Sequence, residues 1–238
     1  MRHHGGMSLP DSDYARRPGG MNSFLGSVFL QMAASVALSA AAAVLVLKVE
    51  ALQAALFGPA GLTVLGWVVT LAPLGLVIVI GAGVEGLSGA AARGLLALYA
   101  VLVGLSVGVM FIGLAGASIV ATFLIAASAF MVLGFIGFTT ERDLSGLGSF
   151  LTIVLVGLVV AMLVNLFLRS AGLDLVVAAI GILLFAGLTA YDTQRLKRLY
   201  EEQSPMSGSA SASLGALTLY LDFLNLFLSL LRFTGRRR

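Results

Sequence analysis

Two aspartates, Asp192 and Asp222, lie in strongly apolar sequence near the end of the chain, within TAYDTQ and LYLDFLNLF. Charge is scarce around them, because Asp, Glu, Lys and Arg make up 11% of the 238 residues against 59% hydrophobic residues. An ionised aspartate at the centre of a membrane helix costs about 2.5–3.5 kcal/mol on insertion scales. Carboxylates placed there are therefore expected to serve a function, and protons and cations are what they can bind.

The chemistry of these aspartates depends on whether they meet. If the two carboxyl groups approach each other, desolvation and mutual repulsion both disfavour two full negative charges. We then expect the pair to share one proton and to titrate as a unit. With one proton the pair would hold two helices together, and when fully ionised it would push them apart or take up a cation. The alternative is a structural role, in which each aspartate hydrogen-bonds backbone groups near a helix end. This role fits Asp192 better than Asp222, because Arg195 follows Asp192 by three residues.

Asp222 belongs to a polar stripe on the last apolar segment. Spacings of 4, 3, 4 and 3 residues place five polar side chains on one helical face: Thr218, Asp222, Asn225, Ser229 and Arg232. The residues between them are almost wholly Leu and Phe, so this face is expected to turn toward a bundle interior or a wet cavity. Thr189 shares a face with Asp192 on the preceding segment, and Asn165 is a further polar candidate.

The composition predicts an all-α polytopic membrane protein. The mean hydropathy is +1.06, and apolar stretches recur that are long enough to cross a hydrocarbon core of about 30 Å. In lipid only helices and closed barrels satisfy the backbone. Barrel strands alternate apolar and polar residues, and these stretches do not.

Seven apolar segments are predicted, at 24–47, 62–84, 94–113, 116–138, 147–168, 173–193 and 213–233. Loop residues separate them, as at Gly58-Pro59, whereas Pro73 predicts a kink inside the second segment. Gly104 and Gly108 have the small-xxx-small spacing that permits close helix contact. We expect a disordered polar tail at 1–22, one membrane domain at 23–234 and a basic tail at 235–238.

The basic residues favour a cytoplasmic N-terminus. That side would carry Arg2, Arg16, Arg17, Arg93, Arg142, Arg195, Lys197 and Arg198, against Lys48 and Arg169 on the other side. The arginines at 236–238 contradict this orientation, because an odd number of crossings places them outside. Either the last segment crosses against the rule or it re-enters and leaves the tail inside.

Several other function classes are disfavoured. The chain has no cysteine, and its two histidines lie in the polar tail at positions 3 and 4, so thiolate or histidine metal sites and disulfides are not expected. The net charge of +3 comes from termini and short loops, which favours contact with anionic lipid over nucleic acid. Ser88 and Ser106 lie in GxSG and GxSxG strings, but no histidine follows position 4 to act as their base. We therefore expect no enzyme, and the absence of an evident inverted repeat disfavours a secondary transporter.

Three strings resemble the Bax inhibitor-1 family, most closely its bacterial branch: ERDLSGLGSFL at 141–151, AGLTAYDTQRLKRLY at 186–200 and LGALTLYLDFLNLFLSLLRF at 214–233. The resemblance spans residues 24–233. It implies seven transmembrane helices, with six surrounding a central C-terminal helix. It also implies a pH-sensitive calcium leak in which Asp192 and Asp222 form the proton-sensing pair at the pore.

Further residues match the family's pattern, and one region departs from it. Arg232 matches a basic residue at the end of the central helix, and Asp143 matches the acidic residue of the loop before helix five. Relatives can carry arginines at the end of helix two that engage the helix-six aspartate, but here the sequence reads GVEGLSGAAARG. Arg93 or Arg195 would have to pair with Asp192 instead.

The function expected from residues and resemblance together is a calcium leak in the bacterial inner membrane. Two carboxylates and Asn225 supply too few oxygens for a tight Ca²⁺ site, so Asp192 and Asp222 are expected to bind Ca²⁺ weakly and transiently, as a permeant ion. No tightly bound cofactor is expected; lipid, Ca²⁺ and H⁺ are the expected partners. The rival is a non-conducting regulatory protein that binds a membrane-embedded AAA protease through residues 1–22, a role associated with bacterial relatives.

Overall fold

The structure, a computed structural model, describes residues 18–59, 61–83, 88–112, 114–201 and 209–234. In this part of the chain the elements are α1 (Pro18–Lys48), α2 (Glu50–Leu56), β1 (Phe57–Gly58), β2 (Gly61–Leu62), α3 (Val64–Gly83), α4 (Gly89–Phe111), α5 (Gly116–Thr139), α6 (Ser145–Leu168), α7 (Ala171–Glu201) and α8 (Ser209–Thr234). The two strands form one short antiparallel hairpin. Apart from this hairpin the described elements are helices, so the prediction of an all-α protein is confirmed.

Six of the described helices, α1 and α4 to α8, are long and apolar enough to cross a membrane. A seventh helix, α3, is apolar over Val64–Ile78, which is a shorter stretch than in the other six. Pro73 lies inside α3, which continues past it as the sequence predicts. The protein is therefore helical, and six of its described helices are candidates to span a membrane.

Two helices extend beyond their predicted ends. α1 begins at Pro18 and so includes residues 18–22, which the sequence places in the polar tail. α7 continues to Glu201, eight residues past its predicted end. In this extension Leu196 is buried while Arg195 is exposed, so the helix still packs one face on the bundle after its apolar run has ended.

The connection between α1 and α3 holds structure that was not predicted. Helix α2 and the β1–β2 hairpin fill it, and Gly61 adopts a φ of +108°, a conformation that favours glycine. Thr63 then caps α3, because its hydroxyl accepts a hydrogen bond from the amide of Gly66 at 3.0 Å. These elements are too short for hydrophobic periodicity to reveal.

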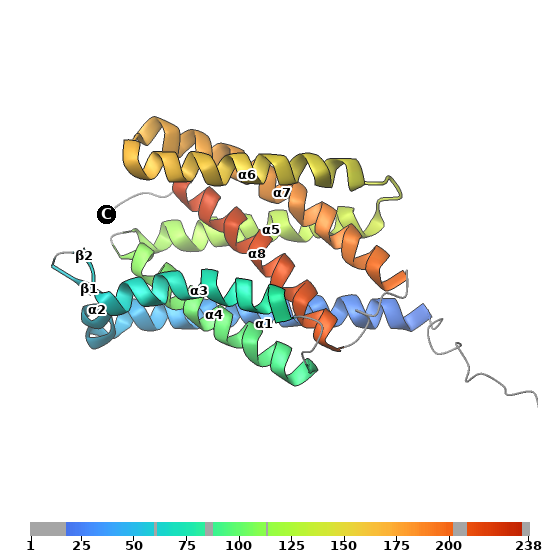
Figure 1. Cartoon of the computed structure of the whole chain (residues 1–238), viewed down its shortest axis with the longest axis horizontal. Helices are drawn as coiled ribbons and strands as arrows, with labels where there is room; N and C mark the ends of the chain where they lie inside the picture. The colour runs from blue at the N-terminus through green and yellow to red at the C-terminus, as the bar shows by residue number, and fades with distance from the viewer. Residues whose placement is uncertain (1–17, 60, 84–87, 113, 202–208, 235–238) are drawn as a thin grey trace, which may run out of the picture.

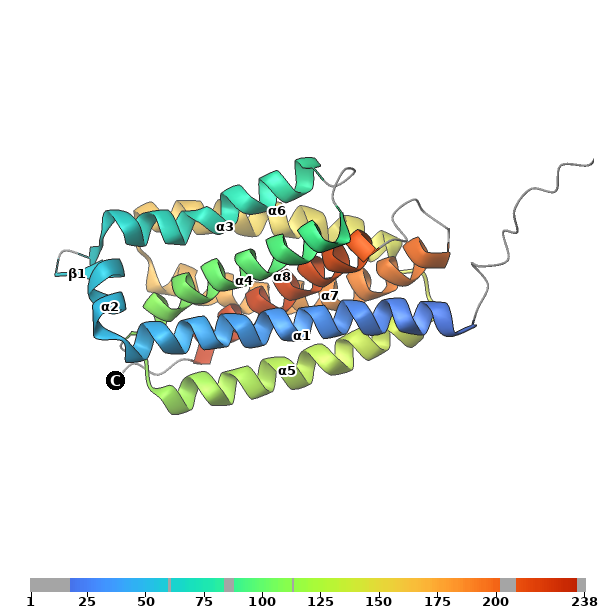
Figure 2. The same ribbon diagram turned by 90° about the horizontal axis from the view of Figure 1, so that it is seen from below.

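α8 lies among four other helices, α1, α4, α5 and α7 (Figures 1 and 2). α3 packs mainly on α4, and α6 on α7, at the periphery of the bundle. α8 is one unbroken helix that crosses the bundle diagonally and finishes at the end opposite to the start of α1 (Figure 1). The last segment is therefore one helix long and apolar enough to cross a membrane, and whether it crosses or re-enters stays a prediction.

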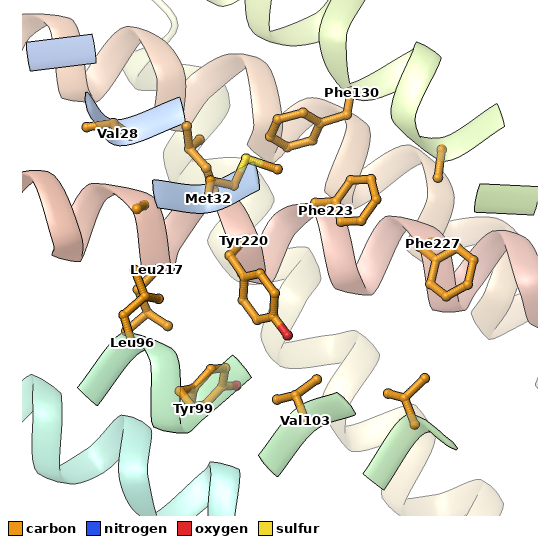
Figure 3. Packing of buried hydrophobic residues seen from close by; sticks show 14 of the residues in the cluster. Val28, Met32, Leu96, Tyr99, Val103, Phe130, Leu217, Tyr220, Phe223 and Phe227 are labelled. Carbon is orange, nitrogen blue, oxygen red and sulfur yellow. The ribbon is translucent and has the colours of Figure 1, made fainter. Parts of the chain in front are cut away.

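Aromatic side chains of α8 build the core. Phe223 contacts Phe130 of α5 edge to face, with ring centroids 5.7 Å apart, and lies parallel to Phe227 at 6.5 Å (Figure 3). Phe227 in turn meets Phe111 of α4 at 6.0 Å. Pairs in these geometries add about 0.5–1.5 kcal/mol each beyond the area they bury. They bind α8 to helices on two sides.

α1 and α4 approach closely at Gly104 and Gly108. A Cβ atom at Gly104 would collide with the backbone oxygen of Ser39 and lie 2.7 Å from the Cβ of Ala42. A Cβ atom at Gly108 would lie 2.9 Å from the Cβ of Val46. The close contact predicted from the glycine spacing is therefore confirmed.

This contact predicts opposite effects for two alanine substitutions in α4. Gly104→Ala should lower the free energy of unfolding by about 1–3 kcal/mol, because the methyl group overpacks the α1 interface. Gly94→Ala is the matched control, because a Cβ atom there meets nothing within 4 Å, and it should be neutral or stabilise the helix by up to about 1 kcal/mol. Thermal unfolding of the detergent-solubilised protein, followed by circular dichroism, measures both. Equal destabilisation by the two variants would contradict the close packing.

Candidate functional site

Asp192 of α7 and Asp222 of α8 lie in contact across the interface between these antiparallel helices. Both are buried, with exposed fractions of 7% and 5%, and their carboxyl groups are close enough to interact with each other. Since an ionised carboxylate only accepts, a hydrogen bond between two carboxyl groups requires a proton on one of them. The arrangement can therefore hold one proton between two helices.

The two carboxyl groups have different surroundings. Asp192 lies 3.8 Å from Nη1 of Arg195, one turn further along α7. Asp222 has a buried oxygen, Oδ2, that finds no hydrogen-bond partner among the described residues. Of the two arginines that the sequence offered as partners, Arg195 is the one in place, and in the described residues Arg93 forms no ion pair. Because Arg195 is more than half exposed, solvent weakens its attraction for Asp192.

A cavity reaches one member of the pair. Its volume is about 150 Å³, and Asp192, Arg195 and Thr218 line it together with Phe24 of α1 and Ser211 of α8. Since a water molecule occupies about 30 Å³ of liquid, the cavity has room for a few. Asp222 is not among the lining residues. The pair thus has one carboxyl next to a wettable space and one enclosed by protein.

The predicted polar stripe is only partly directed at this site. Thr218 lines the cavity, and Ser229 faces Gly181 of α7, where an added Cβ atom would lie 2.6 Å from the serine hydroxyl. Asn225 instead donates to the carbonyl of Leu221 on its own helix at 2.9 Å. Arg232 is exposed at the end of α8.

Two further predicted residues satisfy their polar groups locally. The hydroxyl of Thr189, which is fully buried, donates to the carbonyl of Phe185 at 2.7 Å. Asn165 is not part of the site, because its side-chain oxygen accepts from the amide of Ser170 at 3.0 Å, at the end of α6. Both bonds stay within or next to the residue's own helix, an alternative that sequence spacing does not reveal.

Gln194, two residues after Asp192, fixes the loop between α5 and α6. Its side-chain oxygen accepts from the amide of Leu144 at 2.9 Å, and its nitrogen donates to the carbonyl of Arg142 at 2.8 Å. Gln194 lies just past the predicted segment 173–193, and its burial is seen in the structure and not in the sequence. The loop is thereby tied to the same turn of α7 that presents Asp192.

Asp143 strengthens that attachment. Its carboxylate accepts hydrogen bonds from the amide of Ser145 at 2.9 Å and from Arg198 of α7. The pKa of Asp143 is lowered to about 2, first by the backbone amide of Ser145, then by the Ser145 hydroxyl and by Arg198. The residue that the resemblance marked in this loop therefore connects it to the end of α7.

A second polar row, on α1, was missed. Every fourth residue is polar, from Ser27 through Gln31 and Ser35 to Ser39, a spacing that places them on one helical face. Gln31 accepts from the hydroxyl of Ser213 on α8 at 2.6 Å. The hydroxyl of Ser39 lies 2.7 Å from both the carbonyl of Ala100 on α4 and the hydroxyl of Tyr220 on α8. Because Ser39 has one proton and uses it on carbonyl groups, Tyr220 is the donor in the last bond.

Comparisons with known proteins extend over this whole bundle. The family model described as inhibitor of apoptosis-promoting Bax1 matches residues 21–238. The chain is 47% identical to the inner membrane protein YbhL of Escherichia coli over 171 residues, which cover 71% of this chain and 73% of that protein. It is 37% identical over 220 residues to an uncharacterized protein of Rickettsia prowazekii, with 92% of each covered. An uncharacterized protein of Deinococcus radiodurans is 40% identical over 220 residues, which cover 91% of this chain and 92% of that protein.

The Ser39–Tyr220 bond predicts an asymmetric mutational effect. Ser39→Ala should cost about 1–3 kcal/mol, because it leaves the buried Tyr220 hydroxyl without an acceptor. Tyr220→Phe should cost about 0.5–1.5 kcal/mol, because Ser39 still donates to its carbonyl groups. The double variant should be more stable than Ser39→Ala alone. Thermal unfolding in detergent measures all three, and equal costs for the two single variants would exclude the assigned direction of the bond.

The loop contact predicts a shifted titration. In Arg198→Ala the pKa of Asp143 should rise from about 2 toward its ordinary 3.8, yet stay below it because the Ser145 amide remains. Since the folded-state pKa is the lower one, the ionised contact is complete above pH 3.8 and is lost as the pH falls through about 2. Carbon-13 NMR titration of labelled aspartate, assigned with Asp143→Asn, measures the shift. Arg142→Ala is the control in the same loop, and an equal shift there would show that only overall charge matters.

Proposed function

The chain belongs to the Bax inhibitor-1 family, and on that premise we propose that it is a pH-sensitive calcium leak channel gated by Asp192 and Asp222. The observation that carries the proposal is the close approach of these two buried carboxyl groups across the α7–α8 interface. A protonation change there alters the force between two helices. The charged side chain that faces the pair is Arg195, 3.8 Å from Asp192.

The proposed gate works through repulsion. With one proton the pair shares a hydrogen bond and α7 stays on α8. When that proton leaves, two negative charges face each other in a medium of low dielectric constant, where their repulsion is much stronger than in water. The helices then separate, or a cation enters and neutralises the pair. The cavity beside Asp192 gives the proton and the cation a route to the pair.

Calcium is proposed as a permeant ion and not as a tightly held ligand. In the described residues no group of three or more His, Cys, Asp and Glu side chains lies close enough to hold a metal. Ca²⁺ takes six to eight oxygens in tight sites. Two carboxylates therefore support weak, brief binding, which suits conduction.

The topology proposed for this function has seven crossings, with α3 as the additional one and α8 as the helix that the others surround. α3 is apolar, and it runs back toward the end of the bundle where α1 begins (Figure 2). We place that end in the cytoplasm of a bacterial cell, because α4 begins there, the α5–α6 loop lies there and α7 ends there (Figure 1), and these segments carry Arg93, Arg142 and Arg198. The cavity beside Asp192 then opens toward the cytoplasmic side.

Calcium flux into dye-loaded proteoliposomes, measured at several pH values, tests the proposal. Wild type should carry a flux that changes with pH, and Asp192→Asn and Asp222→Asn should each lose that dependence, because an amide cannot ionise. Asp174→Asn is the matched control: this aspartate is exposed in the first turn of α7, and its removal should leave the pH dependence unchanged.

A wild-type flux that never exceeds that of empty liposomes would exclude the leak. The protein would then be a non-conducting regulator that binds a membrane-embedded protease or another stress-response partner through residues 1–22. Most of that segment lies outside the described residues. In neither case do we propose an enzymatic reaction.

A further inference from the structure

A second, larger hollow lies away from the aspartate pair, between α1, α4, α5 and α8. Its volume is about 340 Å³, which falls within the range of small-ligand sites. Two exposed side chains, Val44 of α1 and Val120 of α5, stand on its rim, and two buried ones, Phe223 and Phe227 of α8, form part of its floor. The hollow is therefore a groove that leads from the outer surface of the bundle down to α8.

The groove is apolar and opens toward lipid. Its lining side chains are aliphatic or aromatic apart from Ser39 and Tyr220, and the hydroxyl groups of these two already bond each other. Its rim belongs to helices that are apolar and long enough to cross the membrane. The rim is therefore expected to contact lipid hydrocarbon. The lining offers no free polar group that would bind water.

The length of the groove matches one leaflet. Along α1 its lining runs from Val36 to Leu47, which is about 16 Å at 1.5 Å per residue. Half of a hydrocarbon core of about 30 Å is about 15 Å. Leu47 is the residue before the end of α1, so the groove runs from that end of the bundle toward the middle of α1.

A positive charge stands where the groove meets that face. Lys48 follows Leu47 directly, is exposed, and is the basic residue in the last turn of α1. An ammonium group at this depth can pair with a phosphate at the membrane surface. Glu50 lies two residues further on, in the first turn of α2, and provides a neighbour of opposite charge for comparison.

We infer that this groove binds a membrane phospholipid, with one acyl chain against Phe223 and Phe227 of α8 and the phosphate at Lys48. The acyl chain exchanges one apolar environment for another, so its retention depends on packing against the groove wall and on the headgroup contact rather than on the hydrophobic effect. The bound chain lies beside the helix that carries Asp222. A phospholipid thereby becomes a structural component of the bundle.

Photolabelling of the full-length protein tests the inference. The probe is phosphatidylglycerol with a diazirine on one acyl chain, mixed into phosphatidylglycerol liposomes, and mass spectrometry locates the labelled residues. Wild type should be labelled on α8 between residues 220 and 227, because the groove is the route to these buried side chains. Labelling confined to the outer faces of the bundle would overturn the inference, and would leave the groove to a partner helix or a second copy of the chain.

Two pairs of variants sharpen the result. A Cβ atom at Gly116 meets nothing within 4 Å although Gly116 lines the groove, and Gly157 on the exposed face of α6 is equally open. Gly116→Leu should abolish labelling of α8 and Gly157→Leu should preserve it. Ala40 also lines the groove, so Ala40→Leu should abolish the labelling as well.

The second pair of variants tests the headgroup contact. Lys48→Gln should reduce the labelling of α8 and Glu50→Gln should not. Undiminished labelling in the two groove variants would exclude the chain site, and undiminished labelling in Lys48→Gln would exclude the headgroup contact.

Discussion

Asp192 and Asp222 bring two carboxyl groups together in the interface between two long apolar helices. Two carboxyl groups between apolar helices are stable only if they share a proton, pair with a positive charge or contact water. The bundle provides some of each of these three forms of compensation. The two carboxyl groups approach each other between α7 and α8, Arg195 faces one of them, and a small cavity touches the same one. Asp222, enclosed and with an unsatisfied oxygen, is the member with the least compensation.

α8 connects this pair to the remainder of the molecule. On one side it meets α7 through the carboxyl contact, and on the others it packs aromatic rings against α4 and α5 and hydrogen-bonds α1 through Ser213 and Tyr220. A change in the charge of the pair therefore acts on a helix that four neighbours hold in place. The same turn of α7 fixes the α5–α6 loop through Gln194, so a movement of α7 is transmitted to that loop.

Much of this arrangement could be read from the sequence, because a polar side chain in lipid must find a polar or wet neighbour. That requirement alone predicts that Asp192 and Asp222 face inward, and the glycine spacing predicts the close α1–α4 contact at Gly104. The same requirement does not place Thr189 and Asn165 in the site. The hydroxyl of Thr189 hydrogen-bonds a carbonyl of its own helix, and the amide oxygen of Asn165 hydrogen-bonds a backbone amide at the end of its helix. The requirement also misses the extension of α7 to Glu201, because apolar runs mark depth in the membrane and not the end of a helix. The α1 row from Ser27 to Ser39 was visible in its spacing of four and was overlooked.

Infrared spectroscopy of the membrane-embedded protein tests the shared proton most directly. We expect a protonated carboxyl C=O band at neutral pH that shifts in frequency in Asp192→Asn and in Asp222→Asn, because the proton loses its second carboxyl group. The band should disappear when both aspartates are replaced and persist unchanged in Asp174→Asn. In wild type, the loss of the band should coincide in pH with the change in calcium flux. A wild-type spectrum with carboxylate bands alone at every pH near neutrality would mean that both aspartates are ionised, and would contradict the proposed gate.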